Sequence, residues 1–271
     1  MPLTLQKSGT HSSLSSSLLQ PPFKKFTPDH SLQGSVILII GLRNQGKSTL
    51  TKDLLSYISD IPTGIIISPE EIYTKDYQNK VPDKLIYREY KPNLIPDLIK
   101  KQTQKIANIE HHHTNDEADA DGIIDPRIFL VLDSVYLQYP NESKIEIEVF
   151  LQLINQAREL LITLIITSMC EYVIPPSVRS KIDLIFIFKR TSKPFQQKLY
   201  QIYGKCFFSL DDFVDIIVNL DNYLAMVIKR PSHPLDPDEA TTNRVLWYRA
   251  DEHRARQLKI CNVEDWTDNE F

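Results

Sequence analysis

The sequence has few cysteines, no long apolar run and no excess of positive charge. Its three cysteines, Cys170, Cys206 and Cys261, form no close pair, which argues against a disulfide framework and a zinc site. The apolar run at residues 36–40 is too short to span a bilayer, and no secretory signal marks the N-terminus. We therefore expect a soluble intracellular protein without a membrane segment.

The formal net charge of −4 gives the chain no general attraction for nucleic acid. Any DNA contact must come from a local basic patch or from a pore built by several subunits. The 271 residues and 42% apolar content suffice for one large domain, expected at residues 34–255. The serine-rich stretch at 12–17 and the prolines at 21, 22 and 28 predict a disordered tail over residues 1–33. Residues 256–271 are expected to form a C-terminal tail.

Strand and helix patterns alternate through most of the chain. Strands are expected at 35–40, 64–68, 128–132, 162–167 and 182–188, and helices at 48–59, 93–107 and 146–161. This order predicts an α/β fold with a mainly parallel central sheet flanked by helices. Further helices at 194–204 and 210–220 precede strands at 223–228 and 244–248, which are expected to extend the same sheet.

A stretch rich in histidine and acidic residues separates the second helix from the third strand. Its tandem residues could ligate a metal, but adjacent side chains cannot all converge on one ion without a rigid turn. We therefore interpret residues 108–126 as a mobile, solvated loop.

The sequence Gly-Leu-Arg-Asn-Gln-Gly-Lys-Ser, at residues 41–48, forms a complete phosphate-binding loop (P-loop) between a buried strand and an amphipathic helix. Glycines let backbone N–H groups surround a phosphate, and the N-terminus of the next helix adds its positive dipole. Lys47 is expected to bridge the β- and γ-phosphates of ATP, and Ser48 to bind Mg²⁺. The predicted nucleotide-binding residues are Gly41, Asn44, Gln45, Gly46, Lys47, Ser48 and Thr49.

An acid at the end of another buried strand is the expected partner of this loop. Asp133 follows four or five apolar residues and would hold Mg²⁺ through water, the Walker B role. The next residue is Ser134, whose hydroxyl is too weak a base to activate water at neutral pH. Glu70 and Glu71 are alternative bases, although solvated loop charges explain them as well, and we favour that interpretation.

Two other P-loop classes lack their motifs here. Residues 79–82, Asn-Lys-Val-Pro, lack the acid with which a guanine-reading motif contacts the base. No arginine-rich cluster of the kind that closes over the phosphates in small-molecule kinases follows the third strand.

The sequence resembles the genome-packaging ATPases of large DNA viruses and related elements, within the FtsK–HerA superfamily. The resemblance extends from about residue 36 to residue 250, and the segments that carry it are 41–50, 52–55, 65–69, 129–133, 164–167, 174–179, 182–186, 199–200 and 245–250. There are two departures. Ser134 stands where the family has a second acid, and Met169 stands where it has a glutamine thought to sense the γ-phosphate.

The resemblance implies a homo-oligomeric ring that hydrolyses ATP with Mg²⁺ to move double-stranded DNA into a capsid. It also implies a capsid or portal partner, and a location in the virus factory of the host cytoplasm and in the virion. Arg158 and Arg179 match family positions, and either could act as a catalytic arginine on a neighbouring subunit or belong to a structural ion pair. The alternative function is that of a nucleotide-binding structural or regulatory protein with slow or no hydrolysis.

Overall fold

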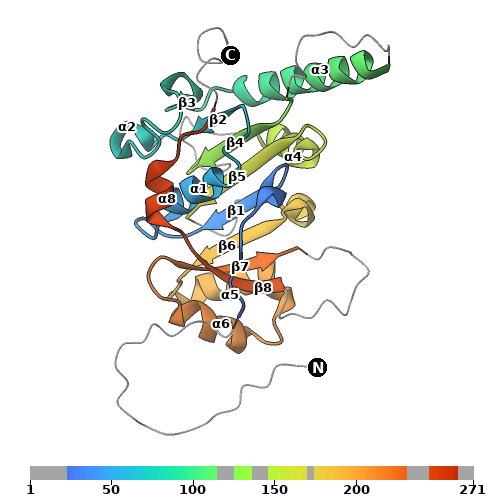
Figure 1. Cartoon of the computed structure of the whole chain (residues 1–271). Coiled ribbons are helices and arrows are strands. Elements are labelled where there is room, and N and C mark those ends of the chain that lie inside the picture. Colours follow the sequence, from blue (N-terminus) through green and yellow to red (C-terminus); the bar gives the residue numbers. More distant parts are fainter. Residues whose placement is uncertain (1–22, 115–124, 136–145, 170–173, 231–243, 262–271) are drawn as a thin grey trace, which may run out of the picture.

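The computed structural model describes residues 23–114, 125–135, 146–169, 174–230 and 244–261 (Figure 1). Its centre is an eight-stranded sheet in the order β3-β2-β4-β5-β1-β6-β7-β8. The strands are β1 (Val36–Ile40), β2 (Thr63–Ile67), β3 (Ile86–Tyr87), β4 (Ile128–Asp133), β5 (Ile162–Ser168), β6 (Leu184–Phe188), β7 (Leu224–Lys229) and β8 (Val245–Arg249). In this order, neighbouring strands from β3 through β6 pair in parallel. Strand β7 pairs antiparallel with β6, and β8 pairs antiparallel with β7. The predicted α/β class and the C-terminal extension of the sheet are confirmed.

Helices cover both faces of the sheet (Figure 1). They are α1 (Lys47–Ser56), α2 (Glu71–Thr74), α3 (Leu94–Thr114), α4 (Ile147–Gln156), α5 (Lys193–Tyr203), α6 (Leu210–Asn219) and α8 (Glu252–Gln257). Alternate residues of each strand face opposite sides. In β1, Leu38 packs in the core with α3 to α6, whereas Ile37 and Ile39 pack in the core with α1. Among the described residues, no helix is both long and apolar enough to cross a membrane.

The parallel register brings three chain segments to one edge of the sheet. Ile40, the last residue of β1, lies opposite Ser168 of β5, and Asp133 of β4 lies opposite Thr167. The P-loop therefore leaves β1 at the edge where Asp133 ends β4. This is the carboxyl edge, at which open α/β sheets bind ligands.

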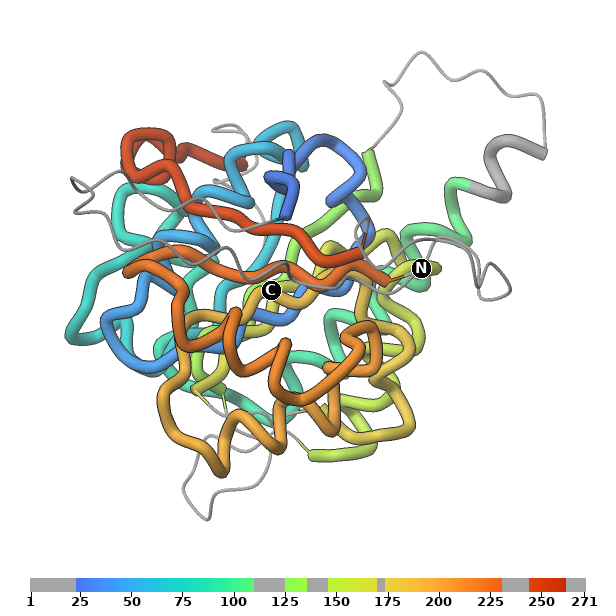
Figure 2. Tube along the Cα trace, turned by 90° about the horizontal axis from the view of Figure 1, so that it is seen from below, coloured from blue at the N-terminus to red at the C-terminus, as the bar shows by residue number. Residues whose placement is uncertain are grey.

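The N-terminal segment is ordered from residue 23, so the prediction of a disordered tail up to residue 33 is wrong for residues 23–33. Trp247 of β8 accepts a hydrogen bond at its carbonyl from the Phe26 amide (2.8 Å) and donates from its own amide to the Lys24 carbonyl (3.1 Å). Figure 2 shows this blue segment close to the red strand β8. The Phe26 ring packs edge-on against Phe186 and Tyr248, with ring centroids 5.7 and 5.9 Å away. Residues 1–22 lie outside the described part of the chain.

The domain also extends beyond its predicted C-terminal boundary. Leu258 and Ile260 are buried in the core beside α1, and the Ile260 amide donates to the Lys80 carbonyl at 3.2 Å. The expectation of a tail from residue 256 is therefore wrong for residues 256–260. The periodic helix signal missed α8 because the helix is only six residues long.

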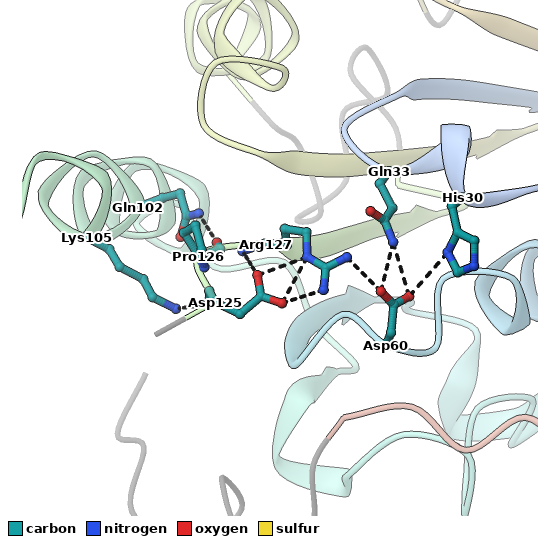
Figure 3. Close-up of polar contacts among 8 residues, drawn as sticks. All are labelled: His30, Gln33, Asp60, Gln102, Lys105, Asp125, Pro126 and Arg127. Atoms are coloured by element: carbon teal, nitrogen blue, oxygen red, sulfur yellow. Dashed lines mark hydrogen bonds and ion pairs between the residues drawn. The ribbon is translucent and has the colours of Figure 1, made fainter. Parts of the chain in front are cut away.

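The predicted mobile loop at 108–126 is wrong at both of its ends. Helix α3 continues to Thr114, and residues 125–127 are fixed by polar contacts (Figure 3). Arg127 forms ion pairs with Asp125 and with Asp60, and Asp60 also accepts from Gln33. The Lys105 ammonium donates to the Asp125 carbonyl at 2.8 Å. Residues 115–124 lie outside the described ranges.

Replacing Phe26 with alanine tests whether the N-terminal segment belongs to the folded core. Phe26→Ala removes a buried ring and should lower the free energy of unfolding by about 3 kcal/mol, measured by urea titration. Phe208→Ala is the matched control because the Phe208 side chain is 79% exposed, and it should change stability by less than about 0.5 kcal/mol. Equal unfolding midpoints for the two variants would contradict the docking of this segment.

Candidate nucleotide site

The P-loop has the backbone geometry of an anion cradle. Asn44 and Gly46 have φ angles of 61° and 95°, both in the left-handed region, and helix α1 begins directly afterwards at Lys47. Gly46 caps the helix without a side-chain hydrogen bond, so the first N–H groups of this ten-residue helix have no side-chain cap. Such N–H groups and the helix dipole together favour a phosphate at this position.

Gly41 is required by close packing at the start of the loop. A Cβ atom at Gly41 would lie 2.8 Å from Cδ2 of Phe188 and 3.3 Å from both Gln45 and Lys47. A larger residue would therefore push the loop away from β6. The motif predicted both glycines, and the structure requires them for different reasons. Gly41 allows close packing, and Gly46 adopts a left-handed backbone conformation.

Two polar side chains of the loop make bonds within or beside it. The Gln45 carbonyl oxygen accepts from the Leu42 amide (2.6 Å), and its amide group donates to the Lys189 carbonyl (3.0 Å). The Lys47 ammonium donates to the Leu42 carbonyl at 3.1 Å. Burial lowers the pKa of Lys47, while the nearby charges of Asp133 and Glu70 counteract that shift. The Gln45 side chain thus links the loop to the residue that follows β6, and the Lys47 side chain folds back onto the loop.

Asp133 is almost fully buried at the end of β4, and its two carboxylate oxygens accept hydrogen bonds from different hydroxyl groups. The Tyr77 hydroxyl donates to Oδ2 at 2.9 Å, and the Thr167 hydroxyl donates to Oδ1. Burial raises the pKa of Asp133, and these donors and the charge of Lys47 oppose the shift. Each carboxylate oxygen has a second lone pair, so the donor set of Ser48 and Asp133 suits Mg²⁺ held partly through water.

Ser134 supports the turn after β4. Its φ angle is 59°, its side chain is buried, and its amide donates to Oγ1 of Thr167 at 3.0 Å. The carbonyl of Met169, at the other departure from the family pattern, accepts from the buried Arg190. Neither position therefore supplies an acid to this edge of the sheet.

The two neighbouring glutamates at the start of α2, the N-cap residue Glu70 and Glu71, have different environments. Glu71 is buried, and its Oε1 accepts from the backbone amides of Tyr77 (2.9 Å) and Gln78 (3.1 Å). Burial raises the pKa of Glu71, and these amides oppose the shift. Our interpretation of Glu71 as a solvated loop charge is wrong. Glu70 remains partly exposed and forms an ion pair with Arg43 of the P-loop at 2.6 Å.

A cavity of about 1040 Å³ opens over the P-loop and is large enough for a nucleotide. It extends between α2 on one side and the β7–α8 region on the other. The lining residues are Arg43, Asn44, Gly46, Lys47, Ser48, Thr49, Lys52, Glu70, Tyr73, Thr74, Asp76, Tyr223, Arg249, Ala250, Glu252, Ala255 and Arg256. The sequence motif identified the loop residues, but not Tyr223 or the α8 residues.

Arg158 and Arg179 lie away from this cavity. Arg158 forms an ion pair with Asp183, whose other oxygen accepts from the amide of Val36, the first residue of β1. Arg179 belongs to the 3-10 helix η4 (Pro176–Lys181), which precedes β6, and its Nε donates to the Ile174 carbonyl. The five residues of β1 separate this edge from the P-loop by about 15 Å. Neither arginine contacts its own chain's P-loop.

Arg190 was not predicted from the sequence. It follows β6, is only 2% exposed, and its positive charge contributes to lowering the pKa of Lys47. The signal that could have identified it is the pair Lys189-Arg190, directly after an apolar strand that neighbours β1.

Comparisons with solved structures match this fold to P-loop ATPases. EssC (ATPases 2 and 3) of Geobacillus thermodenitrificans aligns with a TM-score of 0.53 and 18% identity over 87% of this chain and 45% of EssC. The conjugation coupling protein TcpA of pCW3 aligns with a TM-score of 0.54 and 11% identity, covering 84% of this chain and 65% of TcpA. The chain has the P-loop ATPase fold. The resemblance expected from the sequence is thus confirmed at the level of the fold.

Sequence relatives come from large DNA viruses. The chain is 24% identical over 229 residues to the uncharacterised protein L437 of Acanthamoeba polyphaga mimivirus, covering 82% of this chain and 76% of that protein. It is 30% identical over 177 residues to the uncharacterised protein 075L of Invertebrate iridescent virus 6, covering 65% of this chain and 62% of that protein. The match to the uncharacterised protein 015R of Frog virus 3 covers 63% of the length of that protein. No model of a known protein family matches the sequence.

The adjacent glutamates at the start of α2 give a matched pair of variants. Glu71→Ala leaves two amides without their acceptor and should lower the free energy of unfolding by about 2 kcal/mol. Glu70→Ala removes a partly exposed ion pair and should cost less than about 1 kcal/mol. Urea titration of both variants measures the difference, and a larger loss for Glu70→Ala would contradict the structural role of Glu71.

Proposed function

We propose that this chain is the ATPase subunit of a motor that packages double-stranded viral DNA. The observation that carries the proposal is the P-loop at the carboxyl edge of β1, with Lys47 and Ser48 facing a nucleotide-sized cavity and Asp133 ending β4 nearby. Bound Mg²⁺ would neutralise charge on the β- and γ-phosphates of ATP. Ser48 and Asp133 would hold it, and Lys47 would bind the same phosphates.

The sequence relatives of the chain and the proteins that share its fold support the motor role. Its relatives are proteins of large DNA viruses, and its fold is shared with the ATPase EssC and the conjugation coupling protein TcpA. Such a motor works where capsids are filled, in the virus factory of the host cytoplasm and on the virion. Its partners are double-stranded DNA, further copies of the same chain and a capsid or portal protein.

The position of Arg179 supports a ring of copies. An arginine that stabilises charge on the γ-phosphate must approach within hydrogen-bonding distance, and Arg179 lies at the opposite edge of the sheet from its own P-loop. It can reach a nucleotide only on another subunit. We assign this role to Arg179 rather than Arg158, because Arg158 is paired with Asp183 at the start of β1.

Glu70 is the acid that fits water activation best among the described residues. It lines the cavity, and its negative charge counteracts the lowering of the pKa of Lys47 by burial. By contrast, Glu71 accepts hydrogen bonds from backbone amides, and Ser134 carries no charge. The second candidate function, a nucleotide-dependent switch with slow hydrolysis, is favoured by the missing acid after Asp133. Phosphate release by the wild type with and without duplex DNA separates the two. Stimulation by DNA supports the motor, and nucleotide binding without turnover supports the switch.

The Lys47→Ala variant tests the nucleotide site itself. Loss of the ammonium should weaken ATP binding and abolish turnover, because the β- and γ-phosphates lose their main side-chain partner. Fluorescence titration with a labelled ATP analogue and a phosphate-release assay measure the two effects. Lys100→Ala, on the exposed surface of α3, is the control and should change neither. Unchanged nucleotide binding and turnover in Lys47→Ala would overturn the proposal.

Mixing two inactive variants tests the role of Arg179 in a ring. Arg179→Ala should retain ATP binding and lose turnover by about 10³-fold or more, the range found for catalytic arginines. Mixed with Lys47→Ala subunits, it should regain part of the activity, since some interfaces then combine an intact P-loop with an intact arginine. Arg158→Ala is the matched control and should keep most of its turnover. Failure of the mixture to exceed either variant alone would contradict an action across subunits.

A further inference from the structure

The proposed ligands of phosphate and metal account for one side of the cavity. Lys47, Ser48 and Asp133 account for the β- and γ-phosphates and for Mg²⁺, yet the cavity continues past Gly46 to Tyr223, at the start of β7, and to helix α8.

The order of the strands fixes the direction in which a nucleotide must lie. In the sheet, β4 and β2 lie on one side of β1, whereas β6, β7 and β8 lie on the other. Asp133 ends β4, and Glu70 follows β2, so the metal and the γ-phosphate belong on the β4 side. The ribose and base must then extend across Gly46 towards β7 and α8.

Tyr223 lies directly along this path. A Cβ atom built on Gly46 would lie 3.2 Å from Cδ1 of Tyr223, so the ring packs against Gly46 of the P-loop. Tyr223 is nevertheless 54% exposed. The φ angle of Tyr223 is 63°, a left-handed conformation that a bulky residue rarely adopts. Such strain persists where the surroundings hold it, and here the strained residue is a tyrosine that lines the cavity.

Helix α8 supplies polar groups at the far wall of the same region. Glu252 and Arg256 line the cavity and pair with each other at 3.0 Å, and Arg249 lines it at the end of β8. The helix is held in position by Asp53 of α1, which accepts from the Asp251 amide and from Arg254. This part of the cavity therefore offers one aromatic face together with hydrogen-bonding groups of both charges.

We propose that Tyr223 stacks on the purine base of the bound nucleoside triphosphate, with α8 and Arg249 forming the wall that faces the base and ribose. This inference rests on the proposed nucleotide site and adds its nucleoside half. Stacking on an aromatic ring needs only a π-face and contributes substantially to nucleotide binding. In this arrangement the phosphates bind the backbone of the P-loop rather than the ring.

Two competitors, ATP and inorganic triphosphate, separate the halves of the site. Each displaces a fluorescent ATP analogue from the full-length protein, and inhibition constants are measured for wild type, Tyr223→Asn, Tyr223→Phe, Tyr73→Ala and Lys47→Ala. Asparagine adopts the left-handed conformation readily, so Tyr223→Asn removes the ring without adding backbone strain. Tyr73 is the matched control, because it is an exposed tyrosine at the α2 side of the same cavity.

Tyr223→Asn should weaken ATP about tenfold, or ~1.4 kcal/mol, and leave inorganic triphosphate within twofold. Tyr223→Phe should bind ATP as the wild type does, and the melting temperature of Tyr223→Asn should not fall. Equal weakening of both competitors would overturn the inference, because the ring would then act on the P-loop. Unchanged ATP affinity in Tyr223→Asn, or a tenfold loss in Tyr73→Ala, would also overturn it. If Lys47→Ala binds ATP normally, the nucleotide site itself fails instead.

Discussion

The carboxylate of Asp53 joins the two ends of the domain. Asp53 is fully buried in α1, the helix that begins at the P-loop, and it accepts from the Tyr248 hydroxyl (2.6 Å), the Asp251 amide (3.0 Å) and Arg254 Nε (2.6 Å). A buried charge is stable only with such partners. Because these donors come from β8 and α8, the position of the C-terminal wall of the cavity depends on α1, the helix that begins in the P-loop.

The two edges of the sheet carry different chemistry. The carboxyl edge holds the P-loop, Asp133 and the cavity, whereas Arg158 and Arg179 lie at the amino edge. A hollow of about 620 Å³ at that edge is lined by five cationic side chains: Arg179, Lys205, Lys229, Arg230 and Arg244. A net acidic chain that gathers cations at one place can attract an anionic partner there without a general affinity for nucleic acid.

Local patterns predicted every strand except the two-residue β3, most helices and the phosphate loop, because each depends on residues close in sequence. The parts that were missed depend on distant partners. Nothing in the serine- and proline-rich start indicates that Phe26 packs on Phe186 and Tyr248, which lie 160 or more residues later. In the sequence, Glu71 resembles a solvated acid in the same way as its neighbour Glu70. Only the fold brings the amides of Tyr77 and Gln78 to its carboxylate. Tyr223 has no motif, and only the tertiary packing brings its ring against Gly46.

The acids near the P-loop are held by cations that phosphate also attracts. Glu70 pairs with Arg43, and Asp76 pairs with Lys52, and all four residues line the cavity. The Arg43 side chain is 71% exposed and belongs to the loop that would surround the phosphates. A charged phosphate and the Glu70 carboxylate therefore compete for one guanidinium group. Arg43 therefore links Glu70, the acid that we propose activates water, to the loop that we propose binds the phosphates.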